Sequence, residues 1–310
     1  MEYEKYRDTR PILWVLIYYF ITILGYWHFH YLYIPILCYF SFACATITHN
    51  TIHCSVFKNK IYNEIFEILL SISYGHPVSS FIPGHNKSHH VYTQTSKDAM
   101  RTTKLQYKWH LLNLLLFQQT VSPQILINDI KYITSQKGTY FYKKAIREFR
   151  IVMLLNLLLF FLEFKKFFLL FHIPHLFAQW AIVSINMLQH DGCDIKEEIN
   201  SARNFTGSIL NYLTFNNGYH TIHHINPTLH WTKIPEMHNK YIEKHNHPNL
   251  NQKNMLTYAF KTFIYPGKRI DYLGNPVILY NIEDEPWHKT NDKKNGEVIY
   301  EFAKCIIGKE

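Results

Sequence analysis

Long apolar runs alternate with polar segments along the chain. Two runs, residues 11–29 and 31–48, contain no Lys, Arg, Asp or Glu and are separated by a short turn. Two more runs, residues 151–164 and 167–188, are separated by a pair of lysines. A helix needs about 20 predominantly apolar residues to cross the hydrocarbon core of a bilayer. The pattern therefore predicts two transmembrane helical hairpins, that is, four transmembrane helices.

The other segments, about residues 49–150 and 189–310, are mainly polar. Within the first of them, residues 65–82 are apolar but contain Gly and Pro, and residues 111–117 form a shorter apolar stretch. Both predict helices that lie in the membrane interface or form a re-entrant segment. The pattern as a whole predicts one all-α, multi-pass membrane domain over residues 1–310, in which the polar segments build a cytosolic helical cap.

Positive charge is concentrated in one part of the chain, whose formal net charge is +9. Residues 49–150 hold 13 Lys and Arg against 5 Asp and Glu, whereas residues 191–310 hold 14 of each kind. Cytoplasmic loops carry an excess of Lys and Arg, so we expect this segment and both chain termini in the cytoplasm. No nucleic-acid-binding motif accompanies the charge, which favours lipid headgroups over nucleic acid as its counterpart.

The five cysteines form no CxxC pair, which argues against a cysteine zinc site and against a disulfide framework. We expect free thiols in a reducing compartment.

Histidines gather in three short motifs of the polar segments. They read HNTIH at residues 49–53, HNKSHH at residues 85–90 and HTIHH at residues 220–224. Imidazole is a preferred ligand of iron, copper and zinc. On an ideal helix, at about 100° per residue, the histidines of the three motifs spread over about 40°, 140° and 100° respectively. We therefore expect each motif to present one metal-facing side.

The eight histidines of these motifs exceed what one metal ion accepts, because zinc takes three or four protein ligands. The motifs therefore predict two metal ions. Carboxylates are nearly absent from them, which argues against magnesium, calcium and the carboxylate-rich di-iron bundles. Imidazole-bound iron is the leading interpretation, with copper or zinc as the other options.

The motifs, in this order and interleaved with two hydrophobic hairpins, resemble the membrane fatty acid desaturase and hydroxylase superfamily over roughly residues 10–235. Its signature is HxxxH, then HxxHH or HxxxHH, then HxxHH. Asn217-Gly218-Tyr219 before the third motif and the HHxxP pattern that ends at Pro227 also match. The resemblance implies a non-haem di-iron centre that uses O2 and two electrons to attack an unactivated C–H bond of a lipid chain.

The resemblance also implies the metal ligands. The family takes one more histidine just after its fourth transmembrane helix, and an Asn four residues earlier reaches the metal through water. His190 and Asn186 have this layout. The implied iron ligands, which are also the implied catalytic residues, are His49, His53, His85, His89, His90, His190, His220, His223 and His224, with Asn186 through water.

Two features concern the surroundings of these ligands. Many relatives have Asp after the first histidine of the first motif, whereas this chain has Asn50, so one carboxylate that could orient a ligand is missing. Asp98 and Asp191 are candidates to orient imidazoles instead, and the alternative for both is an ordinary solvated surface.

We interpret the chain as an O2-dependent fatty acyl desaturase whose substrate is a CoA thioester, a carrier-protein thioester or an intact lipid. A fatty acyl or carotenoid hydroxylase or ketolase of the same superfamily would use the same ligands. A membrane metal transporter is the distant alternative, but transporters place ligands near the bilayer midplane, and these motifs lie at or beyond the ends of the apolar runs.

The chain lacks the HPGG motif of a fused cytochrome b5 domain. We therefore expect a separate electron donor, such as ferredoxin or cytochrome b5 with its reductase. A basic surface is predicted to steer this acidic carrier, or else to contact anionic lipid. Its expected members are Lys58, Lys60, Lys87, Lys97, Arg101, Lys104 and Lys108.

Overall fold

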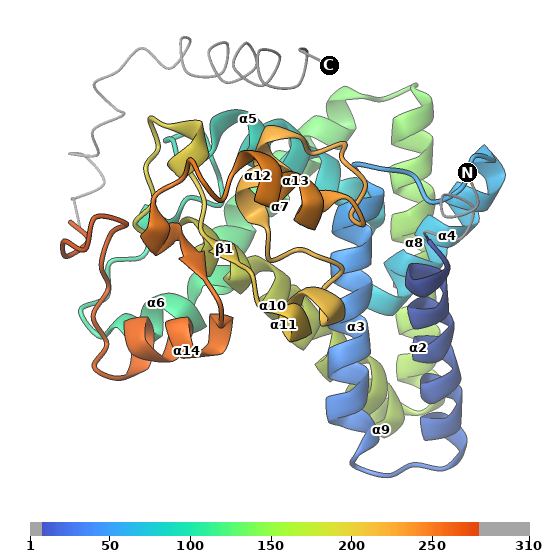
Figure 1. Cartoon of the computed structure of the whole chain (residues 1–310). Coiled ribbons are helices and arrows are strands. Elements are labelled where there is room, and N and C mark those ends of the chain that lie inside the picture. The colour runs from blue at the N-terminus through green and yellow to red at the C-terminus, as the bar shows by residue number, and fades with distance from the viewer. Residues whose placement is uncertain (1–7, 279–310) are drawn as a thin grey trace. The chain divides into compact units, whose positions relative to one another are not determined.

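The structure, a computed structural model, describes residues 8–278, whose regular secondary structure is almost entirely helical (Figure 1). The α-helices are α2 (Thr9–Trp27), α3 (Tyr33–Thr51), α4 (Lys60–Tyr74), α5 (His90–Tyr92), α6 (His110–Leu115), α7 (Phe117–Ser135), α8 (Tyr140–Leu162), α9 (Phe164–Phe167), α10 (Ile173–His190), α11 (Ser208–Leu213), α12 (His220–Ile225), α13 (Ile234–Tyr241) and α14 (Met255–Ala259). The π-helical segments are η2 (Ile82–His89), η4 (Phe168–His172) and η7 (Phe260–Ile264), and the 3-10 turns are η1 (Val78–Ser80), η3 (Thr102–Lys104), η5 (Glu198–Asn200) and η6 (Pro248–Leu250). Within residues 8–278, the strands β1 (Asn204–Phe205) and β2 (Asn251–Gln252) form one short parallel pair. The predicted all-α class is confirmed.

The described residues form two compact units. Unit 1 comprises residues 8–83 and 128–182, and unit 2 comprises residues 84–127 and 183–278. Residues 49–83 and 128–150, which the sequence placed in the cap, cluster with unit 1. Unit 2 carries the second and third histidine motifs. The prediction of a single domain over residues 1–310 stays a prediction.

Two described helices are long and apolar enough to cross a bilayer. They are α2 and the continuous helix Phe164–His190, formed by α9, η4 and α10. They match the first and last of the four predicted spans. A third candidate is the pair Lys60–Tyr74 and Val78–Tyr92, which is bent by 86° and is either a broken span or a re-entrant loop. The candidate spans therefore number two or three, and four are not confirmed.

α3 and α8 lie where the second and third spans were predicted, but polar residues lower the mean hydropathy of both helices. α3 ends in His49-Asn50-Thr51, and the first half of α8 carries several Lys and Arg residues. Inside α3, Thr48 Oγ1 donates to the Cys44 carbonyl at 2.9 Å, which satisfies this hydroxyl within the helix. The apolar runs at residues 31–48 and 151–164 thus correctly predicted helices. Neither helix is confirmed as a membrane span.

Side chains of α2 divide between the interior of unit 1 and its surface. Val15 and Tyr18 are buried, whereas Leu16, Phe20 and Ile23 are more than half exposed. Exposed apolar side chains of this size on a long helix are typical of a surface that faces lipid.

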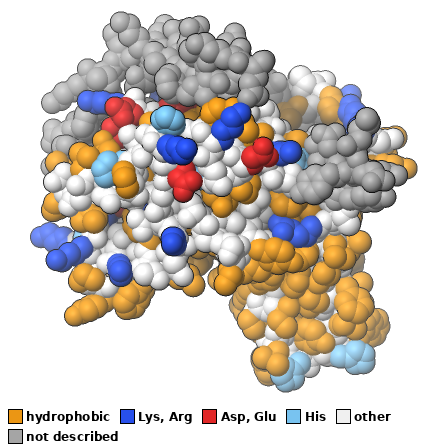
Figure 2. Space-filling view, viewed as in Figure 1, with side chains coloured by type: hydrophobic (Ala, Val, Ile, Leu, Met, Phe, Trp, Pro, Cys, Tyr) orange, Lys and Arg blue, Asp and Glu red, His pale blue; other side chains and the backbone are white. Residues whose placement is uncertain are grey.

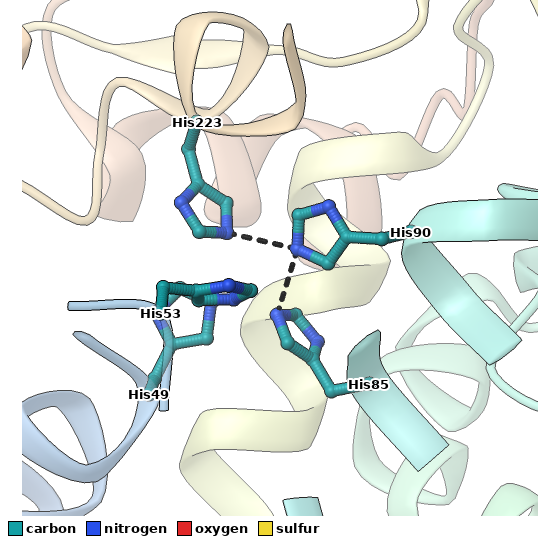
Figure 3. A group of neighbouring side chains, drawn as sticks. All are labelled: His49, His53, His85, His90 and His223. Carbon is teal, nitrogen blue, oxygen red and sulfur yellow. Dashed lines mark hydrogen bonds between the residues drawn. The ribbon is translucent and has the colours of Figure 1, made fainter. Parts of the chain in front are cut away.

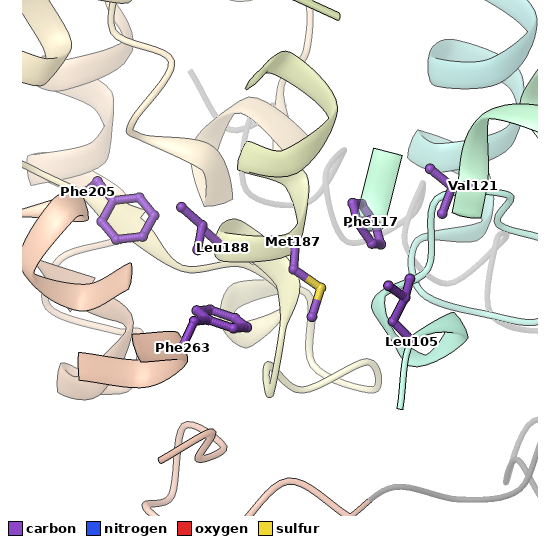
Figure 4. Packing of buried hydrophobic residues seen from close by; sticks show 7 residues of the cluster. All are labelled: Leu105, Phe117, Val121, Met187, Leu188, Phe205 and Phe263. Atoms are coloured by element: carbon purple, nitrogen blue, oxygen red, sulfur yellow. The ribbon is translucent and has the colours of Figure 1, made fainter. Parts of the chain in front are cut away.

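One hydrophobic cluster of unit 2 brings together segments that are far apart in the sequence (Figure 4). It joins α7, the last turns of α10, β1 and η7 through fully or nearly fully buried side chains. Its members are Leu105, Phe117, Val121, Met187, Leu188, Phe205 and Phe263. The cluster fixes the end of α10, which carries His190.

A second cluster of unit 2 orients α12. Ile222 and Ile225 lie one turn apart on this helix and pack against Ile234 and Ile242. Residues three apart share a face of a helix, so the histidines of α12 are turned away from this cluster.

The turn before α12 requires glycine. A Cβ on Gly218 would lie 2.3 Å from the carbonyl oxygen of Phe205. The Gly218 amide donates to Asn211 Oδ1 at 3.0 Å, and Asn211 Nδ2 donates to the same Phe205 carbonyl at 2.7 Å. This close approach explains the Asn-Gly-Tyr sequence that leads into the third motif.

The cysteines agree with the expectation of free thiols within the described residues. Cys38, Cys44, Cys54 and Cys193 form no disulfide. Cys305 lies outside the described residues.

Candidate metal centre

The second histidine motif lies on a π-helix. η2 carries His85 and His89, and α5 begins directly after it at His90. Backbone hydrogen bonds of a π-helix join residues five apart, so these residues lie nearly over one another. His85 and His90 consequently point the same way, with their Nε2 atoms 3.0 Å apart. On an α-helix the same two residues would be about 140° apart.

Three histidines of unit 2 form the first group, which we call group 1. His90 Nε2 lies 3.0 Å from His85 Nε2 and 3.1 Å from His223 Nε2 (Figure 3). The rings of His85 and His223 are nearly parallel, at 18°. Group 1 therefore joins η2 and α5 to α12.

Four histidines of unit 2 form group 2, namely His89, His190, His220 and His224. Their ligand nitrogens all lie within 4.8 Å of one another. The Nε2 atoms of His190, His220 and His224 form a triangle with sides of 3.0 to 3.1 Å. Group 2 joins η2, the end of α10 and α12.

Groups 1 and 2 divide the histidines of both motifs. His85 and His90 belong to group 1 and His89 to group 2, while His223 belongs to group 1 and its neighbours on α12 to group 2. Both motifs therefore supply imidazoles to both groups. The expectation that each motif presents a single metal-facing side stays a prediction.

The protonation of two group 2 rings follows from their partners. His190 Nδ1 lies 2.9 Å from the carbonyl oxygen of Ser201, which can only accept, so Nδ1 carries the proton. His89 Nδ1 likewise donates to Asp98 Oδ2 at 2.9 Å. The Nε2 atoms of both rings are therefore lone-pair donors. His89 Nε2 is buried and has no hydrogen-bond partner among the described residues.

This donor set fits a transition-metal ion. The Nε2 atoms of His190, His220 and His224 converge to within 3.0 to 3.1 Å of one another. Converging lone pairs repel one another unless a cation lies between them, so this group of imidazoles could hold a transition-metal ion.

Asp98 is the carboxylate that orients a ligand. Besides His89, it accepts the backbone amides of Gln94 at 2.9 Å and of Met100 at 2.8 Å. Burial would raise the pKa of Asp98, but the interaction with His89 and the hydrogen bonds from the two amides outweigh burial and hold this pKa below its usual range. Asp98 is therefore a carboxylate with fixed geometry behind the ring of His89.

Asp191 does not orient an imidazole. Its carboxylate is paired with Arg269, with Nε to Oδ2 at 2.6 Å and Nη2 to Oδ1 at 2.5 Å, and both side chains are 1% exposed. Arg269 Nη1 also donates to the carbonyl of Leu105 at 3.2 Å. Asp191 therefore neither orients an imidazole nor lies on a solvated surface. Arg269, which is 78 residues later in the sequence, pairs with its carboxylate inside the protein. The pair ties the residue after His190 to the loop that contains Asp98.

A second buried arginine supports the same helix end. Arg203 Nη1 donates to the carbonyls of Leu188 and Asp191, both at 3.0 Å. These carbonyls belong to the last turn of α10 and to the residue after it, where an α-helix has no backbone donors of its own. Arg203 therefore caps the helix that carries His190.

The first motif lies in unit 1. The rings of His49 and His53 are 5.4 Å apart between centroids, as two residues one helical turn apart should be (Figure 3). His49 Nδ1 lies 3.4 Å from Asn50 Oδ1, so a neutral amide lies beside this ring. Burial, together with the nearby His49, lowers the pKa of His53 to about 3.

Asn186 lies on α10 one turn before His190 and is buried. Its Nδ2 donates to the carbonyl of Met100 at 2.9 Å, which links α10 to the loop after the second motif. Its role as a water-holding residue stays a prediction.

The basic surface is smaller than the sequence indicated. Arg101 is buried, with Nη1 donating to the Ser96 carbonyl at 3.1 Å. Lys104 Nζ donates to the Ala99 carbonyl at 2.8 Å. Both side chains contact the loop that holds Asp98. The assignment of Arg101 to the basic surface is wrong because this side chain is buried, whereas Lys104 is partly exposed. The exposed members are Lys58, Lys60, Lys87, Lys97 and Lys108.

His238 is a buried histidine that belongs to neither group. His238 on α13 is fully buried, and neither ring nitrogen has a hydrogen-bond partner among the described residues. Its ring lies 4.9 Å from that of Tyr219 between centroids. Burial lowers the pKa of His238 to about 4.

Sequence reasoning missed three residues that support the site, namely Ser201, Arg203 and Arg269. Ser201 acts through its carbonyl, which no side-chain pattern reveals. The two arginines lie in segments without a recognisable motif, and only the fold brings them to the end of α10.

These features define an all-α protein with two or three candidate membrane spans and with histidine clusters that could hold metal ions. A family model, fatty acid desaturase, matches residues 12–250, and the chain belongs to this family of oxidoreductases. No curated protein and no solved structure matched the chain. Membership implies a lipid acyl chain as substrate.

Proposed function

We propose that this protein is an O2-dependent fatty acyl desaturase, which introduces a double bond into a lipid acyl chain at a histidine-ligated di-iron centre. The observation that carries the proposal is the convergence of two groups of imidazoles in a member of the fatty acid desaturase family. Among residues 8–278, neither group includes a carboxylate. A donor set made only of imidazoles suits iron. It lacks the oxygen ligands that magnesium and calcium prefer.

Nine histidines and one asparagine would hold the two irons. His49 and His53 of the first motif would complete the coordination begun by group 1. Asn186 would complete that of group 2 through a water molecule. The full set is His49, His53, His85, His89, His90, His190, His220, His223 and His224, with Asn186 through water.

Bound iron would supply the O2 activation that an unactivated C–H bond requires. The chain itself keeps the imidazoles neutral and correctly turned. Asp98 and the Ser201 carbonyl each hold an Nδ1 proton, so the Nε2 atoms of His89 and His190 face the metal. Burial, and then the surrounding imidazoles, lower the pKa of His224 well below its ordinary value. These lone pairs therefore stay available at neutral pH.

We further propose the topology and the partners of the enzyme. The four predicted helices would form two hairpins that place the histidine motifs and both termini in the cytoplasm. A separate electron donor, such as ferredoxin or cytochrome b5 with its reductase, would approach the exposed lysines. The acyl chain would be presented as a CoA thioester, a carrier-protein thioester or an intact lipid.

The test is expression in a host that lacks desaturases, followed by gas chromatography with mass spectrometry of total fatty acids. We expect a new fatty acid that is lighter than its parent by two hydrogens. It should be absent with His89→Ala and present with His245→Ala, because His245 is exposed and belongs to neither group. A hydroxylated product instead would assign the chain to the hydroxylases of the superfamily. Metal uptake without any new lipid would contradict the proposal.

A further inference from the structure

Three short helices of unit 2 share one hydrophobic support. α6, α11 and α14 each place apolar side chains against the cluster of Figure 4, through Leu114, Leu210 and Met255 respectively. α14 continues into η7, which packs against α6 and contributes Phe263 to the cluster. Each helix therefore has an inner side fixed in the core of unit 2 and an outer side.

The outer sides of the three helices are also apolar. Ile209 on α11 is 76% exposed, Leu256 on α14 is 75% exposed, and Trp109 immediately before α6 is 62% exposed. Ile264 on η7 is half exposed, and Tyr265 directly after it is 73% exposed. Large apolar side chains gathered in this way are unusual on a surface that faces only water.

The charged residues in the segments that form these helices are all basic. Residues 107–117, 206–214 and 251–270 contain no Asp or Glu. They contain four exposed lysines, namely Lys108, Lys253, Lys261 and Lys268. In Figure 2, hydrophobic side chains with Lys and Arg beside them occupy the edge of unit 2 where Figure 1 labels α6 and α14.

Apolar side chains with Trp and Tyr, bordered by Lys and without acidic residues, match the chemistry of a bilayer surface. The apolar side chains would enter the acyl boundary, the aromatic rings would lie at the level of the headgroups, and the lysines would meet anionic lipid. A surface that binds another protein more commonly has a polar rim, in which positive and negative charges both occur.

We propose that α6, α11 and the α14–η7 segment form a lipid-docking face, by which unit 2 rests on an anionic membrane surface in addition to the membrane-crossing helices of the chain. The α14–η7 segment lies entirely beyond residues 12–250, which the family model matches. The proposal concerns where unit 2 lies on the membrane and is independent of the reaction that the metal centre carries out.

The first test measures immersion in the bilayer by spin labelling of the full chain in nanodiscs that contain phosphatidylserine. In a background with the native cysteines replaced, labels are placed by Ile209→Cys and Leu256→Cys, and by the controls Lys233→Cys and Glu236→Cys. The controls are exposed polar positions of the same unit. All four positions lie on the surface, so labelling should not disturb folding.

We expect the labels at 209 and 256 to collide more often with O2, which concentrates in lipid, than with a water-soluble nickel chelate. The two control labels should show the reverse preference. Nickel accessibility at 209 and 256 equal to that of the controls would overturn the proposal. Protection from both agents would also overturn it, because it would mean that another protein or a second copy covers the face.

The second test addresses the lysines. Hydrogen–deuterium exchange of residues 255–264 should be slower in nanodiscs with phosphatidylserine than in nanodiscs of phosphatidylcholine alone. Lys253→Ala with Lys261→Ala should remove this difference, whereas Lys233→Ala should not. Equal exchange in both lipids for the unchanged chain would overturn the electrostatic part of the proposal.

Discussion

The pair of Asp191 and Arg269 allows a quantitative test of how the end of α10 is held. Arg269→Gln removes the guanidinium and leaves the Asp191 carboxylate, which is 1% exposed, without its cation. Breaking a buried ion pair from one side costs about 3–5 kcal/mol, because the remaining charge stays buried without a partner. At about 2 °C per kcal/mol for a chain of this size, the apparent Tm should fall by about 6–10 °C.

The matched control is Arg147→Gln. Arg147 Nη2 lies 2.8 Å from Glu64 Oε2, a similar distance, but these side chains are 43% and 21% exposed. Solvent screens such a pair, which is worth about 0.2–1 kcal/mol, so its loss should lower the apparent Tm by about 2 °C or less. Asp191→Asn combined with Arg269→Gln should recover part of the stability, since no charge then remains buried.

Differential scanning fluorimetry of the detergent-solubilised full chain, at one scan rate for all variants, measures these shifts. Equal losses for Arg269→Gln and Arg147→Gln would show that burial does not set the strength of the pair. A double variant as unstable as Arg269→Gln alone would show that the uncompensated carboxylate is not the cause.

Three further predictions concern the histidines. Asp98→Asn should weaken metal retention about 10–100-fold, as measured by chelator competition, because the carboxylate behind His89 is lost; unchanged retention would remove Asp98 from the site. Elemental analysis should find about two irons per chain, and His223→Ala should lower this content while His245→Ala does not; stoichiometric zinc would contradict the assignment. His238 has a folded pKa of about 4, below its ordinary value of 6.5, so the unfolded chain binds the extra proton and stability falls as the pH drops from about 6.5 towards 4. His238→Leu should therefore shrink the loss of apparent Tm between pH 7 and pH 5, and an unchanged loss would show that His238 does not titrate in this range.

Local patterns predicted much of the fold and the site, because their causes are local. The apolar runs at residues 11–29 and 167–188 correspond to the two helices that meet the length and hydropathy of a span. Seven of the nine predicted histidines lie in groups 1 and 2 of unit 2. Most of them come from two short motifs, and clusters of this kind are visible in the sequence. The family resemblance also pointed to His190, which no cluster in the sequence marks.

Contacts between distant segments could not be read from the sequence. Arg269 lies 78 residues after Asp191, and no periodicity connects the two. Arg101 and Lys104 have the composition of a solvated surface, yet backbone carbonyls of their own loop bind them. The helical wheel also failed for the second motif, because it assumes 3.6 residues per turn, whereas η2 has a wider turn.

The π-helix of η2 has a consequence for how this motif tolerates changes in length. A π-helical turn accommodates one more residue than an α-helical turn while keeping the flanking chain in register. Removal of one residue between His85 and His89 would convert the i, i+5 pair of His85 and His90 into an i, i+4 pair, which an α-helix also places on one side. The extra residue of HNKSHH relative to HxxHH is thus absorbed by the backbone, and the ligand positions can persist while the spacing between them varies.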